Sequence, residues 1–114
     1  MNICGESFEI HLDESNNTVA FKGALRLSGM EDYGPILDML KRTLSNPVKA
    51  IVFDLKELEF LNSSGITMLS RFVIEARDRV EISLSFVASE SVPWHGRSLK
   101  NLQRLMPSLI VSLT

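Results

Sequence analysis

The pattern of hydrophobic and polar positions predicts that the chain opens with a β-hairpin. Apolar and polar side chains alternate over residues 8–12, as in a half-buried strand. A polar turn follows at 13–17, where either asparagine can adopt a left-handed conformation. Residues 18–22 return as a second strand, which residues 23–27 either continue or leave.

The next segment predicts a helix whose start can be placed in two ways. Ser28 and Glu31 resemble a capping box, whereas Pro35 suits a first helical turn better than a helix interior. We therefore expect either a short turn followed by a helix from about Gly34, or one kinked helix, ended by residues 46–47. Its buried face consists of Ile36, Leu37, Leu40 and Leu44.

The centre of the chain predicts a strand followed by a helix. Residues 50–55 form an apolar run rich in β-branched and aromatic side chains, which is typical of a strand buried on both faces. Apolar residues then recur at helical spacing, and the polar residues fall mostly on the opposite side. The apolar positions of this helix are Ile66, Leu69, Phe72, Val73 and Ala76.

The last third predicts a strand, a helix and an edge strand. Residues 80–86 alternate, and a helix connects them to the 50–55 strand, so the two strands should pair in parallel. After a loop at 88–93, a helix marked by Leu99, Leu102, Leu105 and Met106 ends at Pro107. Residues 109–114 read as a short final strand at a sheet edge, and Trp94 as an aromatic lid over the core.

Between the central strand and helix lies the polar tetrad Asn62-Ser63-Ser64-Gly65. As an N-cap, Asn62 would accept a hydrogen bond from an N–H group that the helix leaves free. Local physics favours this capping role, with both serines as small polar first-turn residues. The same geometry also suits a switch, because a phosphate on a first-turn serine is tolerated by the positive end of the helix.

Composition narrows the possible functions. The chain has 114 residues, enough for one domain over 1–114 with a core of its own. A net charge of −2 argues against sequence-independent nucleic-acid binding, and one cysteine excludes an internal disulfide. We see no secretion signal and no apolar run that would span a bilayer, so we expect a cytoplasmic protein without membrane contact.

Residues for catalysis, cofactors or metals are not evident. The serines lack a Gly-x-Ser-x-Gly elbow, and neither His11, on the first strand, nor His95, in a late loop, has an evident orienting partner. There is no glycine-rich phosphate loop and no zinc spacing. We therefore expect no enzymatic activity, no cofactor and no metal.

The stretch from Val52-Phe53-Asp54-Leu55 to Asn62-Ser63-Ser64-Gly65-Ile66 resembles the signature of STAS domains, the family that includes anti-sigma factor antagonists. Their pattern is a strand ending in Asp-Leu, a short connection, and Asp-Ser-Ser-Gly-Leu or Asp-Ser-Thr-Gly-Leu opening a helix. The resemblance implies an α/β fold, a STAS-like mixed sheet of four to five strands with helices packed mainly on one face.

The resemblance also implies a non-enzymatic, partner-switching regulator. Ser63 would be the phosphorylated residue, with Ser64 as a backup acceptor, and the partners would be a serine kinase or anti-sigma-type regulator and a phosphatase. Asn62, Ser63, Ser64, Gly65 and Arg26 would contact the partner, with Gly65 allowing close approach of its backbone. The alternative is a constitutive, unphosphorylated STAS subunit of a larger assembly, such as a transporter ATPase complex.

Two positions depart from the antagonist pattern. Asn62 replaces the usual aspartate, which keeps the cap but removes a charge beside Ser63. Arg26 stands where the antagonists usually carry an acidic residue. An arginine there can pair with a phosphate on Ser63, or can be a solvated side chain.

Overall fold

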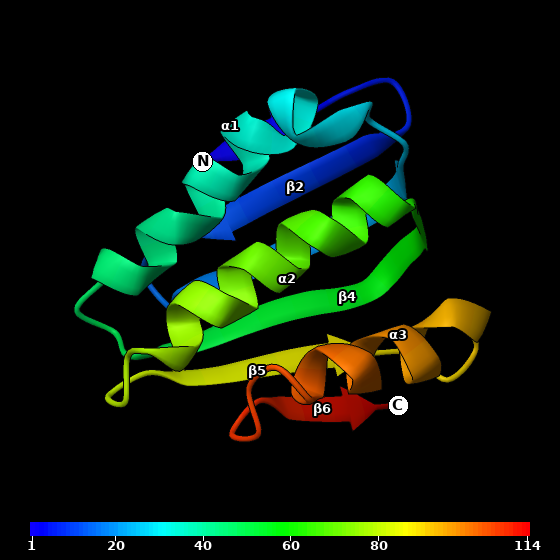
Figure 1. Cartoon of the computed structure of the whole chain (residues 1–114). Coiled ribbons are helices and arrows are strands. Elements are labelled where there is room, and N and C mark those ends of the chain that lie inside the picture. The colour runs from blue at the N-terminus through cyan, green and yellow to red at the C-terminus, as the bar shows by residue number, and fades with distance from the viewer.

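The computed structural model describes all residues 1–114 and shows a six-stranded mixed sheet with three helices on one of its faces (Figure 1). The strand order in the sheet is the same as the order in the chain. The elements are β1 (Asn2–Cys4), β2 (Phe8–Asp13), β3 (Thr18–Leu25), α1 (Gly29–Lys41), the short 3-10 helix η1 (Arg42–Ser45), β4 (Ala50–Leu61), α2 (Ser63–Arg77), β5 (Ser83–Ala88), α3 (Pro93–Gln103) and β6 (Ile110–Leu113).

The predicted α/β fold with helices on one face is confirmed, and the sheet is larger than the four to five strands predicted. Strands β1, β2 and β3 pair antiparallel, whereas the pairs β3–β4, β4–β5 and β5–β6 are parallel. The extra strand is β1, whose three residues are too few to show an alternating pattern. The predicted hairpin, the turn with a left-handed Asn17 (φ 53°) and the edge strand at the C-terminal end are confirmed.

One hydrophobic core fills the space between the sheet and the helices, and Phe53 lies at its centre. The Phe53 ring stacks on Phe86 of β5 with centroids 5.2 Å apart. It also contacts Phe21 of β3 at 5.5 Å and Phe72 of α2 at 4.9 Å. These aromatic contacts join three neighbouring strands and the central helix, so the core fixes α2 over the middle of the sheet.

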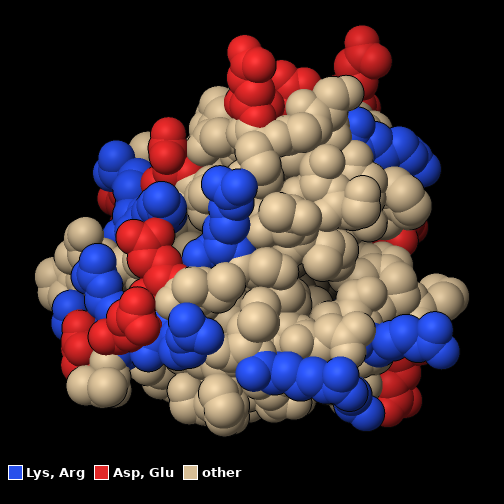
Figure 2. Space-filling model, viewed as in Figure 1, with Lys and Arg blue, Asp and Glu red and all other residues tan.

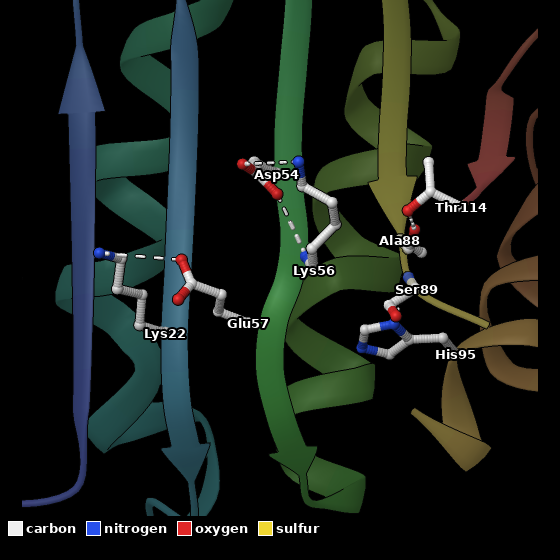
Figure 3. Close-up of polar contacts among 8 residues, drawn as sticks. All are labelled: Lys22, Asp54, Lys56, Glu57, Ala88, Ser89, His95 and Thr114. Atoms are coloured by element: carbon white, nitrogen blue, oxygen red, sulfur yellow. Dashed lines mark hydrogen bonds and ion pairs between the residues drawn. The ribbon is translucent and has the colours of Figure 1, made fainter. Parts of the chain in front are cut away.

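Strand β4 differs from its prediction in two ways. It is buried on one face only, since Ile51, Phe53 and Leu55 are buried while Val52 and Asp54 are half-buried. The strand also continues to Leu61, where a short connection had been predicted. The charged residues that interrupt its apolar run lie on the face without helices, as in the Lys22–Glu57 and Lys56–Asp54 ion pairs drawn in Figure 3.

The boundaries of three further elements can be compared with their predictions. Helix α1 is one helix from Gly29 with Pro35 inside it, so of the two predicted alternatives the single helix is the one observed, but the Ser28 side chain makes no capping hydrogen bond. Helix α3 begins at Pro93 and ends at Gln103, so two of its four predicted marker positions lie beyond it. Strand β5 begins only at Ser83, and Val80, predicted on its apolar face, is 97% exposed.

The parallel connections determine where the helices begin. Helices α1, α2 and α3 each follow one of the strands β3, β4 and β5, which run in the same direction. The three helices therefore all start at the carboxyl ends of these strands, on the right in Figure 1. This end of the sheet is called its edge below. The tetrad lies at this edge, where α2 begins.

Candidate functional site

Asn62 joins the end of β4 to the start of α2 and is the N-cap of that helix, as predicted. Its side-chain Oδ1 accepts a hydrogen bond from the Gly65 N–H at 2.9 Å, and its carbonyl accepts from the Ile66 N–H at 3.0 Å. The cap satisfies one of the N–H groups that the first turn leaves without an intrahelical partner.

The Asn62 amide also ties two other segments to this point. Its Oδ1 accepts a second hydrogen bond from the Tyr33 hydroxyl of α1 at 2.7 Å, and its Nδ2 donates to the Leu27 carbonyl at 2.8 Å. The orientation of the amide follows from the partners, because Gly65 N–H can only donate and the Leu27 carbonyl can only accept. An aspartate could make the cap but not the bond to Leu27, which explains the asparagine at this position.

Tyr33 is the functional neighbour that sequence reasoning missed. The residue is fully buried, and burial raises the pKa of its hydroxyl, so the hydroxyl stays protonated and donates to Asn62. The available signal was a single tyrosine within an apolar helix face, because a buried hydroxyl needs a partner. The sequence did not indicate that this partner is Asn62, since 29 residues separate the two.

Packing inside the molecule gives Gly65 a role that does not depend on a partner. The residue is buried, and a Cβ at this position would lie 2.9 Å from the Tyr33 hydroxyl and overlap the Leu61 side chain. Close approach of a partner backbone is therefore not needed to explain the glycine.

The two serines stand at the surface above this network. Ser63, the first residue of α2, is exposed, and Ser64 is half-buried. The first turn of α2 contains no acidic residue. Thr67, one turn further on, is also exposed, and its hydroxyl donates to the Ser63 carbonyl at 3.0 Å. Ser63 is thus accessible at the positive end of α2. The start of this helix is fixed by the hydrogen bonds of the Asn62 side chain to Gly65, Tyr33 and Leu27.

Arg26 lies beside the tetrad, but its side chain is turned onto an aromatic ring. The Leu25 carbonyl accepts a hydrogen bond from the Asn62 N–H at 3.2 Å, which places the end of β3 next to the start of α2. The Arg26 guanidinium lies 4.6 Å from the centre of the Phe60 ring, in the geometry of a cation–π contact. Phe60 is 40% exposed and Arg26 is exposed, so the pair lies at the surface where β3 and β4 end.

The first turn of α3 is hydrogen-bonded to the last part of β4. Trp94 Nε1–H donates to the Glu59 carbonyl at 3.0 Å, and His95 Nε2–H donates to the Leu58 carbonyl at 2.8 Å. The Ser89 N–H donates to His95 Nδ1 at 3.0 Å (Figure 3). The bonds from Trp94 and His95 satisfy carbonyl groups of β4 that lie beyond the residues paired with β5. Trp94 also packs against the core, as the predicted lid.

The predictions for the two histidines have different outcomes. His95 lies in α3 rather than in a loop, and it is fully buried with two backbone partners, contrary to the prediction. Burial lowers its pKa, and the ring is held neutral with its proton on Nε2. His11 lies on the first strand of the hairpin, as predicted; this strand is β2, where His11 is exposed and contacts the Asn2 side chain.

Two surface pockets lie at the other end of α1. They measure about 320 and 520 Å³ and share Arg42, which directly follows the helix. No three His, Cys, Asp or Glu side chains come together in a group that could hold a metal ion. None of the helices is both long and apolar enough to span a membrane.

Comparison with known proteins shows the fold. No protein-family model and no curated protein sequence matches the chain. Among solved structures, apo-SiaC from Pseudomonas aeruginosa superposes with a TM-score of 0.76 at 16% identity, covering 100% of this chain and 97% of that one. A chain from the complex of the diguanylate cyclase SiaD with its activator SiaC gives the same TM-score at 15% identity, covering 100% and 99% of the two chains.

An anti-sigma factor antagonist from Mycobacterium paratuberculosis superposes with a TM-score of 0.63 at 19% identity, covering 94% of this chain and 88% of that one. The chain therefore has the STAS-like fold that the sequence resemblance implied.

Proposed function

We propose that this chain is a non-enzymatic regulatory binding protein of the partner-switching type, with Ser63 as the phosphorylated residue. The observation that carries the proposal is that Ser63 is exposed at the first position of α2, directly after Asn62, whose side chain is held by the part-buried hydrogen bond from Tyr33. A phosphate there would add nearly two negative charges to a surface whose supporting backbone is fixed. The fold shared with SiaC and with an anti-sigma factor antagonist supports this class of function.

The partner that we propose is a signalling protein in the cytoplasm. SiaC is the activator of the diguanylate cyclase SiaD, and the other structural neighbour is an anti-sigma factor antagonist. A serine kinase or anti-sigma-type regulator would bind unmodified Ser63 and its surroundings, and a phosphatase would reset the switch. Phosphorylation would release the partner, because it places negative charge in a contact from which water is excluded.

Arg26 and Phe60 form the side of this surface that responds to the phosphate. The guanidinium rests on the exposed ring next to the start of α2. A phosphate on Ser63 offers charge-assisted hydrogen bonds, which are stronger than an exposed cation–π contact. Phosphorylation would therefore draw Arg26 from Phe60 and change the shape of the surface as well as its charge.

The first test is to map phosphorylation by mass spectrometry on the protein isolated from its native host, beside a Ser63→Ala variant. We expect phosphate on Ser63 that is lost in the variant. The partner that co-purifies should then bind Ser63→Asp at least tenfold more weakly than wild type. Thr67→Asp adds the same charge one turn along the same exposed face and is the matched control. If Ser63→Asp bound every cognate partner as tightly as wild type does, the proposal would be refuted.

A constitutive binding subunit is the second candidate, and one observation favours it. Asn62 and Gly65 are each explained by hydrogen bonding and packing within the chain. The tetrad therefore does not require a switch. Persistent absence of phosphate, together with a partner that co-purifies in fixed proportion, would support the subunit.

A further inference from the structure

The charges of this chain are divided unevenly along its length. Residues 1–90 contain nine Lys or Arg and fourteen Asp or Glu residues. Residues 91–114 contain three basic residues and no acidic one. The last part of a chain with net charge −2 is thus a positively charged segment, and α3 and β6 make up more than half of it.

The three basic residues form one face of a single helix. Arg97, Lys100 and Arg104 are spaced three and four residues apart on α3 and its C-cap, and all three are exposed. The opposite side of the helix is buried through His95, Leu99 and Leu102.

These three cations have no counter-charge within the molecule. The four ion pairs of the chain involve other basic residues, namely Lys22, Lys41, Arg42 and Lys56. Figure 2 shows basic side chains along the lower edge of the molecule, where α3 lies, with an acidic one beside them at the lower right, and further acidic side chains at the top, on the side of α1. We call Arg97, Lys100 and Arg104 the basic face of α3.

The helix that carries the basic face begins at the end of the sheet where Ser63 lies, and Arg97 is its fifth residue. Helices α2 and α3 both start there and pack against each other (Figure 1). Trp94 at the start of α3 is half-buried and bonded to the backbone next to the half-exposed Phe60. Trp94 and Phe60 thus place two aromatic side chains near the ends of the strands where α2 and α3 begin. Aromatic and arginine side chains are the residues most enriched at protein–protein contacts.

We infer that the basic face of α3 docks an acidic segment of the partner protein. The inference rests on the proposed function in requiring a protein partner, and it adds the chemistry by which that partner is recognised. Three cations on one helix face match carboxylates at helical spacing on a partner segment, and the aromatic pair would supply the apolar anchor. The net negative charge of the whole chain disfavours a long polyanion such as nucleic acid.

The inference also explains how a phosphate on Ser63 would release the partner. An acidic segment lying over the start of α3 would meet the added negative charge, and like charges across an interface repel. The switch would then act by repulsion as well as by the cost of burying a charge.

The test uses a defined probe, a helical peptide with glutamates spaced three and four residues apart on one face, and the same peptide with glutamines. The ¹⁵N-labelled protein is titrated with each peptide and followed by NMR. The variant R97Q/K100Q/R104Q removes the basic face. The control K22Q/K41Q/K56Q removes the same amount of charge from ion-paired positions on β3, α1 and β4. All six residues are surface positions, and Lys100→Gln alone replaces the triple variant should that not fold.

We expect the glutamate peptide to shift amide signals of α3 and to bind at least tenfold more weakly to R97Q/K100Q/R104Q, with less than a threefold effect of the control. Binding should weaken as salt is raised. Equal losses in both triple variants, or no binding of the glutamate peptide at millimolar concentration, would overturn the inference. Tighter binding of a 20-base-pair DNA or of phosphatidylglycerol vesicles through the same residues would overturn it as well.

The outcome is distinguishable from that of the proposed function. If R97Q/K100Q/R104Q loses the cognate partner while Ser63→Asp retains it, the docking surface stands and the switch fails. If Ser63→Asp releases the partner while the basic-face variant retains it, the switch stands and the docking inference fails.

Discussion

Replacing Asn62 by aspartate is expected to destabilise the protein, although aspartate is an equally good helix cap. The new carboxylate can accept the hydrogen bonds of Gly65 and Tyr33 as Asn62 does. Its second oxygen, however, would face the Leu27 carbonyl at the position where Nδ2 now donates at 2.8 Å. The hydrogen bond from Asn62 to the Leu27 carbonyl would thus be replaced by a contact between two oxygen atoms that both accept hydrogen bonds.

The magnitude follows from opposing terms. Leaving a partly buried acceptor without its donor costs about 1–3 kcal/mol. A carboxylate at the start of a helix returns about 0.3–1 kcal/mol. The expected net loss is therefore about 1–2 kcal/mol of the free energy of unfolding at pH 7, or about 1 M in the urea midpoint.

Urea denaturation followed by circular dichroism measures this loss, and Asn46→Asp is the matched control. Asn46 also accepts from a backbone N–H, of Val48, and donates to a carbonyl, of Glu14, each at 2.8 Å. These bonds are exposed, so water can replace the lost donor and the loss should be smaller. The Asn62→Asp deficit should also narrow in acid, where a protonated carboxyl can donate again. Wild-type stability of Asn62→Asp at pH 7 would refute this account of the site.

Two further predictions concern packing and pH. Gly65→Ala should lower the free energy of unfolding by about 1–3 kcal/mol through overpacking, whereas Gly34→Ala, with open space around the new methyl, should be neutral or stabilising in thermal denaturation; equal effects would contradict the packing argument. Burial lowers the pKa of His95 in the folded state. In the unfolded state the histidine has its ordinary pKa of about 6.5, so at lower pH the unfolded state binds more protons than the folded state. The free energy of unfolding should therefore fall as the pH drops from about 7 to 5, by up to about 1.4 kcal/mol per pH unit. His95→Gln should flatten this slope, and the exposed His11→Gln should keep it; a slope unchanged in His95→Gln would assign the pH dependence to other groups.

The sequence predicted the elements best where local pattern decides the structure. Alternation marked β2 and β5, and helical spacing marked α2, because each of these elements buries only one face. The same rule failed in β4, where Glu57 and Glu59 broke the apolar run although backbone pairing with β3 continues to Leu61. It also placed the start of β5 too early, because Val80 is apolar but lies in an exposed turn.

The site was predictable only as far as it is local. The Asn62 cap depends on residues three positions apart and was correctly predicted. The bonds that fix the same amide come from Tyr33 and Leu27, which only the tertiary fold brings to it. The buried partners of His95 were missed for the same reason, since Leu58 lies 37 residues away.

The agreement between strand order and chain order has a consequence for how this sheet can be assembled. Each new strand joins the sheet at the side of the strand that preceded it, from β1 to β6. No strand has to insert between two that are already paired, and no early strand has to wait for a distant one. As the chain emerges from the ribosome from its N-terminal end, the sheet can grow outward one strand at a time, with its unpaired edge always facing the segment that is synthesised next.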